Sequence, residues 1–414
     1  MTFIKNCDII DLIKGSCFNS LINIIMQKKI YLSVIMLVLL ALSTTAADMP
    51  RRKIVVFEGG FSNEAAKDGL LARHAGIQIK NLDLVRGKVV YLSERATVDL
   101  AKEKGVLRID DDVVVEALTH RGQTQQSQTQ AAQSLPWGIN KIDAELVWPT
   151  GNLANPVKVG IIDTGISKDH SDLKANIKGG VNTINSRKSW TDDNGHGSHV
   201  AGIVGALNNS LGVVGVAPQV DLYAIKVLGA NGSGYLSDVI EGIDWAKNRN
   251  LNVINMSLGT SADVQSMHDA VIAAKAAGVT IVAAAGNSGG AVIYPAAYPE
   301  VIAVGATDAN DQIAYFSSHG PEVDLAAPGV SIYSTYKGTG YKILSGTSMA
   351  APHVTGTAAL VLNTPVGAND TNANGKWDPD EVQNKLMSTA TDLGAAGQDE
   401  FFGAGLVNAF AATQ

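Results

Sequence analysis

The sequence has almost no cysteine. Of 414 residues only Cys7 and Cys17 are cysteines, and both lie in the first 17 positions. If that segment is removed from the working protein, no cysteine remains, which excludes disulfide bonds, a thiol nucleophile and cysteine-ligated zinc. An excess of positive charge is also missing, because 32 Lys and Arg stand against 39 Asp and Glu and the formal net charge is −7. Nucleic acid is therefore not an expected partner.

Proline, aromatic side chains and charge are scarce, whereas glycine is abundant. The chain has 12 Pro, 6% aromatic and 17% charged residues, against 42 Gly and 46% hydrophobic residues. This apolar content excludes a wholly disordered chain and allows a large buried core. The many glycines indicate close-packed layers joined by tight turns, and the length allows two or three domains.

A secretory signal is predicted near the amino terminus. MQKK is a short basic stretch, residues 30–42 form an apolar run, and STTAA is small enough for signal peptidase. Because the apolar run is too short for a membrane span, we expect residues 1–47 to be a leader that is cut after Ala47. The protein is then secreted, extracellular and not stably associated with a membrane. Residues 1–25 fit a signal peptide badly, so we expect translation to start at Met26. An uncleaved anchor is the alternative.

Two compositionally different parts follow the leader. In residues 48–118, RRKIVVFEGG, KVVYLS and VLRIDDDVVVEAL read as strands and residues 62–75 and 96–105 as helices, which predicts a small α+β domain without obvious chemistry. Residues 119–134 are polar and rich in glutamine, which is typical of a linker. Over residues 135–414, apolar runs such as VKVGIID, DLYAIKVL and TIVAAAG alternate with helical stretches. This alternation predicts a parallel sheet covered by helices on both faces, with functional residues at the carboxyl ends of its strands.

Four polar residues stand where such a sheet would place a site. Asp163 ends the run VKVGIID, His196 opens the stretch HGSHVAGIVG, Asn287 follows TIVAAAG, and Ser348 opens an alanine-rich helical stretch. Each alone has an ordinary explanation as a helix cap or a turn residue. A serine at a helix amino end also meets free N–H groups that suit a developing oxyanion. We interpret His196 as a base and His199 as a packed structural histidine, because no glutamate follows in a zinc-binding arrangement.

Together these segments resemble a known family. The blocks VGIIDTGI, HGSHVAG, INMSLG, AAAGN and GTSMAAPHV look like those of the subtilisin-like serine proteases, the subtilases, and the resemblance covers roughly residues 50–414. It implies an α/β fold, the subtilisin-like three-layer α/β/α arrangement with a mostly parallel sheet, preceded by a small α+β ferredoxin-like propeptide domain. It also implies a serine endopeptidase. The order Asp, His, Asn, Ser along the chain is the order of that family.

The resemblance assigns a catalytic role to each of the four residues. Ser348 Oγ would attack the scissile carbonyl, His196 would take its proton and hand one to the leaving amine, and Asp163 would orient the imidazole. The Asn287 amide and the Ser348 N–H would hold the oxyanion. No departure from the family pattern touches these four residues, and Ser198 stands where the family usually has threonine.

By the same resemblance, a peptide substrate binds as an added strand between two edges of the enzyme. The residues expected to contact it are Gly232, Ser233 and Gly234 on one edge, Ser257, Leu258 and Gly259 on the other, and Ala284, Gly286 and Ile293 at the specificity pocket. The pocket walls are small and apolar, so a hydrophobic residue before the cleaved bond is expected. Ile293 stands where the family often has a small residue at the pocket floor, which predicts a shallower pocket.

Residues 48–118 resemble the inhibitory propeptide of the same family, and VLRIDDDVVVEAL aligns with its end. We therefore expect self-cleavage after Leu118, before Thr119, which leaves the linker as an amino-terminal extension. An apolar leucine also suits an apolar pocket. A cut near Ala131 or Ala132 is the alternative. The expected partners are protein or peptide substrates and the chain's own propeptide, acting as folding chaperone and inhibitor, and the enzyme is expected to be a monomer.

The segment at residues 369–381 fits a calcium-binding loop. NDTNANGKWDPDE matches the EF-hand loop pattern D-x-N-x-N-G-x5-E, in which oxygen ligands at alternating positions converge on one hard cation. The expected ligands are Asp370, Asn372, Asn374, the Lys376 carbonyl, Asp378 and Glu381. No entering helix is evident, so we expect a calcium loop inserted in a subtilase. A solvated Asn/Asp turn is the alternative.

A second calcium site follows from the resemblance alone, through the close match of the segment ALNNSLGVVGVAP. Its implied ligands are Gln133, Asp172, Asn209 and the main-chain carbonyls of Leu207, Leu211 and Val213. Structural Ca²⁺, at two or more sites, is therefore the expected cofactor.

The leading hypothesis is a secreted, calcium-stabilised serine endopeptidase made as a self-processing zymogen, with broad, apolar-leaning specificity. A catalytically silent subtilase acting as a binding or scaffold protein is the alternative, and the presence of all four catalytic residues disfavours it. An esterase of the α/β-hydrolase type needs the motif G-x-S-x-G and the order Ser, Asp, His, whereas Ser348 comes last here. A processing protease for dibasic substrates would need acidic residues beside the pocket segments, which lack them.

Overall fold

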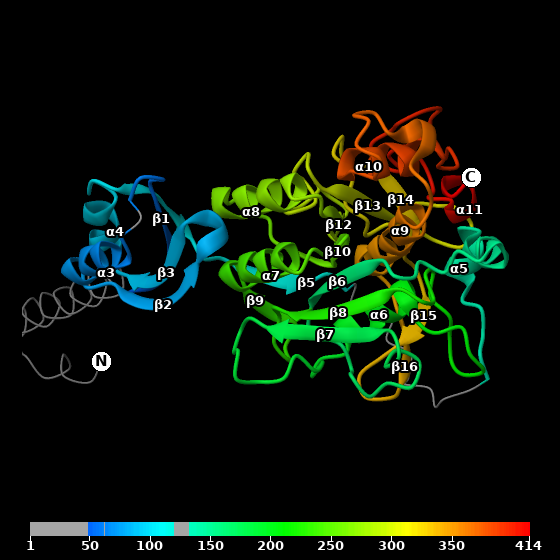
Figure 1. The fold of residues 1–414 in the computed structure, drawn as a ribbon, viewed down its shortest axis with the longest axis horizontal. Helices are drawn as coiled ribbons and strands as arrows, with labels where there is room; N and C mark the ends of the chain where they lie inside the picture. The colour runs from blue at the N-terminus through cyan, green and yellow to red at the C-terminus, as the bar shows by residue number, and fades with distance from the viewer. Residues whose placement is uncertain (1–48, 62, 120–131) are drawn as a thin grey trace, which may run out of the picture.

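The computed structural model describes residues 49–61, 63–119 and 132–414. Within them the chain forms a large domain and a small one that lie side by side (Figure 1). The expected leader with its cut after Ala47, both cysteines and most of the linker lie outside the described residues. Over the part of the chain that is described, no helix is long and apolar enough to cross a membrane.

The large domain is built on a seven-stranded sheet in the order β14-β13-β12-β10-β6-β8-β7, in which every neighbouring pair is parallel. Its strands are β6 (Lys158–Asp163), β7 (Ile177–Asn182), β8 (Asp221–Lys226), β10 (Val253–Met256), β12 (Thr280–Ala284), β13 (Ile302–Thr307) and β14 (Leu325–Pro328). The central five coincide with the apolar runs of the sequence, because strands buried on both faces need continuous apolar residues. The two edge strands, β7 and β14, lacked such runs.

Helices cover both faces of this sheet, so the expected three-layer α/β/α arrangement is confirmed. On one face lie α6 (His196–Gly205) and α9 (Thr347–Leu362), and on the other lie α7 (Leu236–Asn248) and α8 (Gln265–Ala276). Successive side chains of a strand point to opposite faces. In β6, accordingly, Ile161 packs in the core with the first pair of helices and Ile162 in the core with the second.

Helix α9 runs through the interior of the large domain. Its sequence, TSMAAPHVTGTAALVL, is rich in Ala, Gly and Thr, and all but its last residue is buried. A helix without a polar face needs neighbours on every side, and its small side chains let α6 and the central strands pack closely. Its amino end contacts the segments that follow β10 and β12, through Ser257 and Asn287. Residues at the start of α9 therefore lie at the carboxyl edge of the sheet.

The other described elements of the large domain are short. They are α5 (Trp137–Lys141), β9 (Ser233–Tyr235), β11 (Leu258–Gly259), the hairpin of β15 (Ile332–Thr335) and β16 (Tyr341–Leu344), α10 (Pro379–Ser388), α11 (Ala409–Ala412) and 3-10 turns at Ala144–Leu146, Trp148–Thr150 and Gly367–Asn369.

The small domain is a four-stranded antiparallel sheet with two helices on one face. Its elements are β1 (Arg51–Phe57), α3 (Glu64–Arg73), β2 (Ile77–Leu82), a 3-10 turn at Asp83–Val85, β3 (Gly87–Leu92), α4 (Glu94–Leu100) and β4 (Val106–Asp111). The chain order βαββαβ and the strand order β2-β3-β1-β4 are those of a ferredoxin-like fold.

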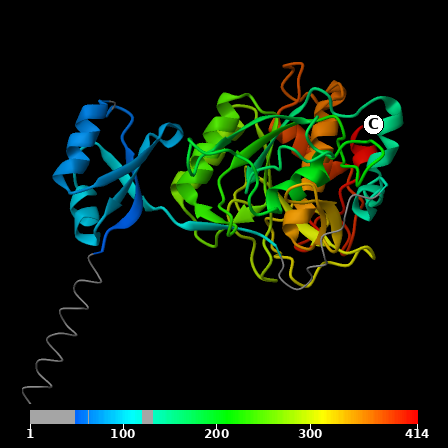
Figure 2. The ribbon, with the colours of Figure 1, turned by 90° about the horizontal axis from the view of Figure 1, so that it is seen from below.

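Two details of the small domain differ from the sequence-based expectation. Strand β2 was not expected, because its sequence IQIKNL is half polar and only its last residue is buried. The last expected strand, residues 106–118, is two strands: β4 stays in the small sheet, whereas β5 (Val114–Ala117) lies between β9 and β11 of the large domain. Beyond β4 the chain leaves the small domain and runs along the large one (Figure 2). The break falls at Asp112, whose carboxylate bonds to the main chain of α7.

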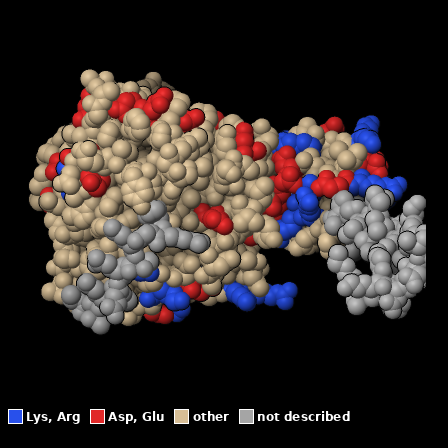
Figure 3. Space-filling view, turned by 180° about the vertical axis from the view of Figure 1, so that it is seen from behind, with Lys and Arg blue, Asp and Glu red and all other residues tan. Residues whose placement is uncertain are grey.

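The free face of the small sheet packs on α7 and α8, where Ile54 joins the same buried core as those helices. Asp112 accepts hydrogen bonds from Ser237 N (2.8 Å) and Oγ (2.9 Å) in the first turn of α7. Asp110 accepts them from Ser266 N (3.1 Å) and Oγ (2.5 Å) in the first turn of α8. Carboxylates at these positions satisfy free N–H groups and complement the helix dipoles. Figure 3 shows acidic and basic residues gathered along this junction.

Candidate active site

A buried carboxylate–imidazole pair lies at the carboxyl edge of the sheet. Asp163 is the last residue of β6 and His196 is the first of α6, and His196 Nδ1 lies 2.8 Å from both carboxylate oxygens of Asp163. Both side chains are almost fully buried. The other ring nitrogen of His196, Nε2, is buried without a hydrogen-bond partner among the described residues. A histidine whose Nδ1 faces a carboxylate presents Nε2 as a base.

A second buried carboxylate, Asp192, holds the segment that leads into His196. Its Oδ1 accepts hydrogen bonds from Thr164 Oγ1 (2.9 Å) and Gly195 N (2.8 Å), and its Oδ2 accepts one from Ser198 Oγ (2.6 Å). The network ties the residue after β6 to the first turn of α6, so it fixes the spacing of the acid and the imidazole. Sequence reasoning missed it, and its only signal is the acidic turn TDDNGHG before the helix. The Ser198 hydroxyl makes a bond that a threonine could also make.

Ser348 lies in the first turn of α9 with its hydroxyl turned to the main chain. Its Oγ donates to Ser257 O at 3.0 Å, and Ser257 Oγ donates to Ser348 O at 2.9 Å. The structure therefore brings Ser348 to the carboxyl edge of the sheet, as expected, but does not pair it with His196 Nε2.

Asn287 reaches the same place from the segment after β12. Its Oδ1 accepts hydrogen bonds from Thr347 N and Oγ1, both at 2.9 Å. These bonds fix the amide so that Nδ2 points outward, where it donates to the main-chain oxygen of Leu118 at 2.6 Å. A carbonyl before the expected cut is thus held by the side chain that the resemblance gives to oxyanion binding.

The end of the small domain lies in the large domain as an added strand. Strand β5 is antiparallel to both β9 and β11, with Glu116 opposite Ser233 on one side and opposite Gly259 on the other. Further main-chain bonds run from Ala117 N to Gly232 O (2.9 Å) and from Leu118 N to Ser257 O (3.2 Å). The two edges expected to bind substrate are therefore the two edges that hold β5.

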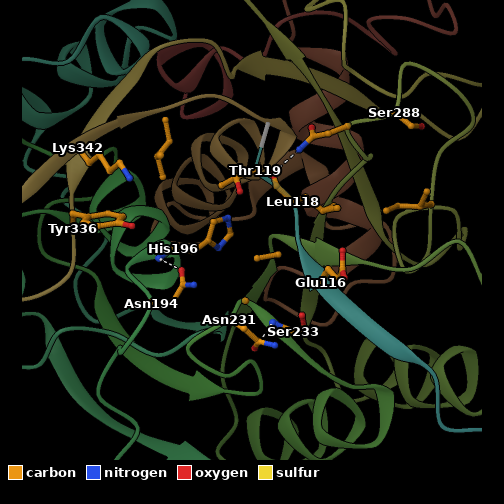
Figure 4. Close-up of a pocket in the computed structure, with 15 residues that line it drawn as sticks. Glu116, Leu118, Thr119, Asn194, His196, Asn231, Ser233, Ser288, Tyr336 and Lys342 are labelled. Atoms are coloured by element: carbon orange, nitrogen blue, oxygen red, sulfur yellow. Dashed lines mark hydrogen bonds between the residues drawn. The ribbon is translucent and has the colours of Figure 1, made fainter. Parts of the chain in front are cut away.

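A cleft of about 690 Å³ surrounds the end of this strand (Figure 4). It is lined by Glu116, Ala117, Leu118, Thr119, Asn194, His196, Asn231, Gly232, Ser233, Asn287, Ser288, Ile293, Tyr336, Lys342 and Leu344. Sequence reasoning did not single out Tyr336, Lys342 and Leu344, which come from the β15–β16 hairpin just before the motif that holds Ser348.

Ile293 fills space between the two walls of the expected specificity pocket. A Cβ built on Gly259 would lie 2.7 Å from Ile293 Cδ1, and one built on Gly286 would lie 3.3 Å from Ile293 Cγ1. Ala284 and Gly286 are both buried, as small pocket walls would be. The side chain of Ile293 is thus in contact with both walls.

His199 is separate from this site although it lies one turn after His196. It is completely buried, and its Nε2 lies 3.1 Å from Ile332 O and 3.0 Å from Lys342 O. Burial lowers the pKa of His199 to about 3, so the ring is neutral and donates from Nε2 to the hairpin. His199 therefore links α6 to β15 and β16.

The expected calcium loop is closed by its own hydrogen bonds. The Asp370 carboxylate accepts from Asn374 N (3.0 Å) and Gly375 N (2.9 Å), and the Asp378 carboxylate accepts from the Asn374 amide (2.7 Å). The Glu381 carboxylate turns back into the loop and accepts from Thr371 N (2.7 Å). Gly375 has a φ of 78°, which suits the sharp turn of the pattern. The expected ligands therefore lie close together, and their carboxylates accept hydrogen bonds from the loop itself.

The residues of the second expected calcium site lie close together and bond to one another. The carboxylate of Asp172 accepts hydrogen bonds from the Asn209 amide (2.7 Å) and Val213 N (2.9 Å). The Gln133 amide lies 2.9 Å from Leu207 O. Leu211 N donates to Asn209 Oδ1 at 2.6 Å, and Leu211 is bridged to Ala132. Within the described residues no group of three or more His, Cys, Asp or Glu is placed to hold a metal ion, so Ca²⁺ at either site would also need Asn, Gln or carbonyl oxygens.

Known proteins resemble this chain over about two thirds of its length. Residues 154–405 match the model of the subtilase family. The chain is 48% identical over 287 residues to an alkaline protease of Alkalihalobacillus alcalophilus, which is 69% of this chain and 72% of that protein. It is 48% identical over 284 residues to subtilisin Savinase of Lederbergia lenta and 49% identical over 288 residues to subtilisin DY of Bacillus licheniformis, in each case 68% of this chain and 100% of the relative.

The chain belongs to the subtilase family, and its relatives identify it as a serine endopeptidase. The fold, the matched motifs and the relatives agree on this class, so the resemblance seen in the sequence is confirmed.

Proposed function

We propose that the chain is the zymogen of a secreted serine endopeptidase, in which residues 48–118 are an inhibitory propeptide and 135–414 the catalytic domain. One observation carries the proposal: Leu118 directly follows β5, the strand held between β9 and β11, and its carbonyl oxygen lies 2.6 Å from Asn287 Nδ2. The buried pair of Asp163 and His196 lies beside it. That is the position of the acyl part of a peptide substrate.

The proposed mechanism gives each of the four residues one role in cleavage of the peptide bond. Ser348 Oγ leaves its bond to Ser257 O and turns toward His196 Nε2, which has no hydrogen-bond partner within the described part of the chain. His196 takes the hydroxyl proton as Oγ attacks the carbonyl, Asp163 stabilises the imidazolium, and Asn287 donates to the oxyanion. The proton then passes to the leaving amine, and water releases the acyl group by the reverse steps. The bond of Ser348 Oγ to Ser257 O does not exclude such a role, because catalytic hydrogen bonds often form only in the complex with substrate.

The same geometry favours self-cleavage between Leu118 and Thr119 over the alternative cut. Leu118 is the residue at the Asn287 amide, whereas Ala132 is bridged to Leu211 in another part of the domain. After the cut, residues 119–134 would remain as an amino-terminal extension, and Gln133 would keep its place near Leu207. The propeptide would stay in place through the main-chain bonds of β5, which makes it an inhibitor as well as a substrate.

The proposed specificity is broad and leans toward apolar residues before the cleaved bond. Main-chain bonds to β9 and β11 accept any sequence, which supports breadth. Small buried walls at Ala284 and Gly286 support an apolar pocket, and the contacts of Ile293 with Gly259 and Gly286 support a shallow one. Leucine, as in the chain's own junction, is therefore expected to suit it better than a large aromatic residue.

We also propose two structural Ca²⁺ sites, at residues 369–381 and around Asp172. The donors at both are carboxylate, amide and carbonyl oxygens, which hard cations prefer. Ca²⁺ bound there would link loop segments of a domain that has no disulfide. The signal peptide, secretion and a monomeric state remain part of the proposal.

Hydrolysis of a short peptide anilide with leucine before the reporter bond tests the proposed activity. The processed wild type should release the anilide, whereas Ser348→Ala should not, and a sulfonyl fluoride should abolish the activity by reacting with Ser348. A folded wild type without activity would support the alternative, a catalytically silent binding or scaffold protein.

A further inference from the structure

The cleft holds a cationic side chain that the proposed mechanism does not use. Lys342 of β16 and Tyr336 of the β15–β16 hairpin line the same cleft as His196 and Thr119. In Figure 4 both lie on the opposite side of Thr119 from Leu118. Because Leu118 precedes the expected cut and Thr119 follows it, Lys342 and Tyr336 lie on the side that receives the residues after the cleaved bond.

The ring of Tyr336 is held rigidly next to the catalytic histidine. A Cβ built on Gly195 would lie 2.4 Å from a ring atom, so the ring packs directly on the backbone that precedes His196. Gly195 also has a φ of 117°, a conformation that side chains disfavour. The hairpin itself is fixed by the bond from His199 Nε2 to Lys342 O at 3.0 Å. The wall of the cleft on this side is therefore preformed.

Tyr336 in turn positions the ammonium group of Lys342. Lys342 Nζ lies 4.7 Å from the centroid of the Tyr336 ring, within the range of a cation–π interaction. The Lys342 side chain is only partly exposed. A charge held over a fixed ring loses little freedom when it binds a ligand, which makes it a better recognition element than a free surface lysine.

Among the described residues, no carboxylate forms an ion pair with Lys342. An acid next to this hairpin, Asp193, already bonds to two other lysines: its side chain to Lys226 and its main-chain oxygen to Lys337. The acidic residue that lines the described cleft is Glu116, which lies before the expected cut. The ammonium of Lys342 is therefore available to a carboxylate that the substrate brings.

We propose that Lys342, held by Tyr336, forms a subsite that favours Asp or Glu in the first two positions after the cleaved bond. The inference rests on the proposed function, since it concerns how that site reads its substrates. The chain's own junction continues Thr119-His120-Arg121, which supplies no acid there. The subsite would thus serve other substrates, and it would not bind the new amino terminus that self-cleavage creates.

The test uses enzyme obtained by letting the full chain process itself. Matched peptides share one sequence up to a leucine and then carry Glu, Ala or Lys in the two following positions. A partly exposed ion pair supports a preference of roughly two- to fivefold in kcat/KM for Glu over Ala, with Lys below Ala. At about 1 M salt, where the screening length is about 3 Å, the preference should vanish.

Variants separate this subsite from general effects on the enzyme. Lys342→Met should remove the preference, so that the Glu and Ala peptides are cleaved with equal kcat/KM. Lys342→Glu should reverse the preference, and Tyr336→Leu should weaken it. Lys337→Met is the matched control, since Lys337 lies in the same hairpin but is exposed and does not line the cleft. It should keep the wild-type preference.

The outcomes distinguish the two proposals. If the Ala peptide is cleaved but Glu is not preferred, or if Lys342→Met keeps the preference, the subsite is refuted and the proposed function stands. If no peptide is cleaved by folded, processed enzyme, the proposed function fails and the subsite fails with it.

Discussion

Replacing Asp112 by alanine should loosen the proposed propeptide without touching the cleft. The carboxylate is almost completely buried at the junction of the two domains, and it accepts bonds from Arg52 Nε at 2.7 Å and from Ser237 N and Oγ at 2.8 and 2.9 Å. Without it, an arginine side chain that is 13% exposed loses its counter-charge, and the first turn of α7 loses its cap.

The expected effect is large because the groups left behind stay buried. Truncating one partner of a buried, hydrogen-bonded charge pair at an interface costs about 2–5 kcal/mol. Because water can reach Arg52 in part, we expect a cost in the lower part of this range, about 2–3 kcal/mol of binding free energy. At about 1.4 kcal/mol per factor of ten, the inhibition constant of residues 48–118 should rise roughly 30- to 150-fold.

The assay measures inhibition of processed enzyme by separately prepared residues 48–118, as wild type and as Asp112→Ala. Asp111→Ala is the matched control, since Asp111 is the neighbouring residue, 64% exposed, and pairs with Lys53 inside the small domain. It should change the constant by less than about fivefold. Equal effects of the two substitutions would refute the role given to the buried carboxylate.

Four further outcomes are expected. Asn287→Ala should lower kcat about 10²–10³-fold with little change in KM, which is the effect known for loss of one oxyanion-hole donor in subtilisin; an unchanged kcat would contradict the oxyanion role. Ile293→Gly should deepen the pocket and raise the kcat/KM ratio of Phe over Leu peptides about tenfold, and a constant ratio would show that Ile293 does not limit it. Removing Ca²⁺ present at about 100 times its Kd should cost about 2.7 kcal/mol of unfolding free energy, seen as a lower Tm with EGTA and restored by Ca²⁺ but not by Mg²⁺. Burial lowers the pKa of His199 to about 3 and that of His353 to about 4. Below about pH 6.5 the unfolded chain therefore binds more protons than the folded one, and the free energy of unfolding should fall toward pH 4 by up to about 1.4 kcal/mol per pH unit for each ring. Denaturation of the inactive Ser348→Ala variant, with and without His199→Gln, should show a shallower dependence of this free energy on pH in the double variant.

The central sheet could be predicted from the sequence because its signal is local. Strands buried on both faces read as continuous apolar runs, and the residue that ends such a run lies at the carboxyl edge. Asp163, which ends such a run, could therefore be placed at this edge, and His196, which opens a helix, could be placed near it. In the structure His196 Nδ1 lies 2.8 Å from Asp163 Oδ1. The edge strands β7 and β14 and the polar strand β2 lack that signal, so their positions depend on neighbours distant in sequence.

The finer parts of the site depend on contacts that no local pattern encodes. Asp192 joins Thr164 to Ser198 across a loop, and its role depends on three segments meeting. Lys342 and Tyr336 reach the cleft from a hairpin that carries no motif. The split between β4 and β5 likewise follows from Asp112 bonding to another domain. The orientation of the Ser348 hydroxyl is a rotamer choice, which composition and spacing leave open.

The most direct test of the proposed zymogen is the intact mass of residues 48–414, refolded with Ca²⁺, as wild type and as Ser348→Ala. The wild type should divide into two chains whose masses place the cut between Leu118 and Thr119, while the variant should stay whole. A cut near Ala131 or Ala132 would contradict the position inferred from the bond between Asn287 and Leu118. A folded wild type that stays whole would contradict self-processing and favour the silent scaffold.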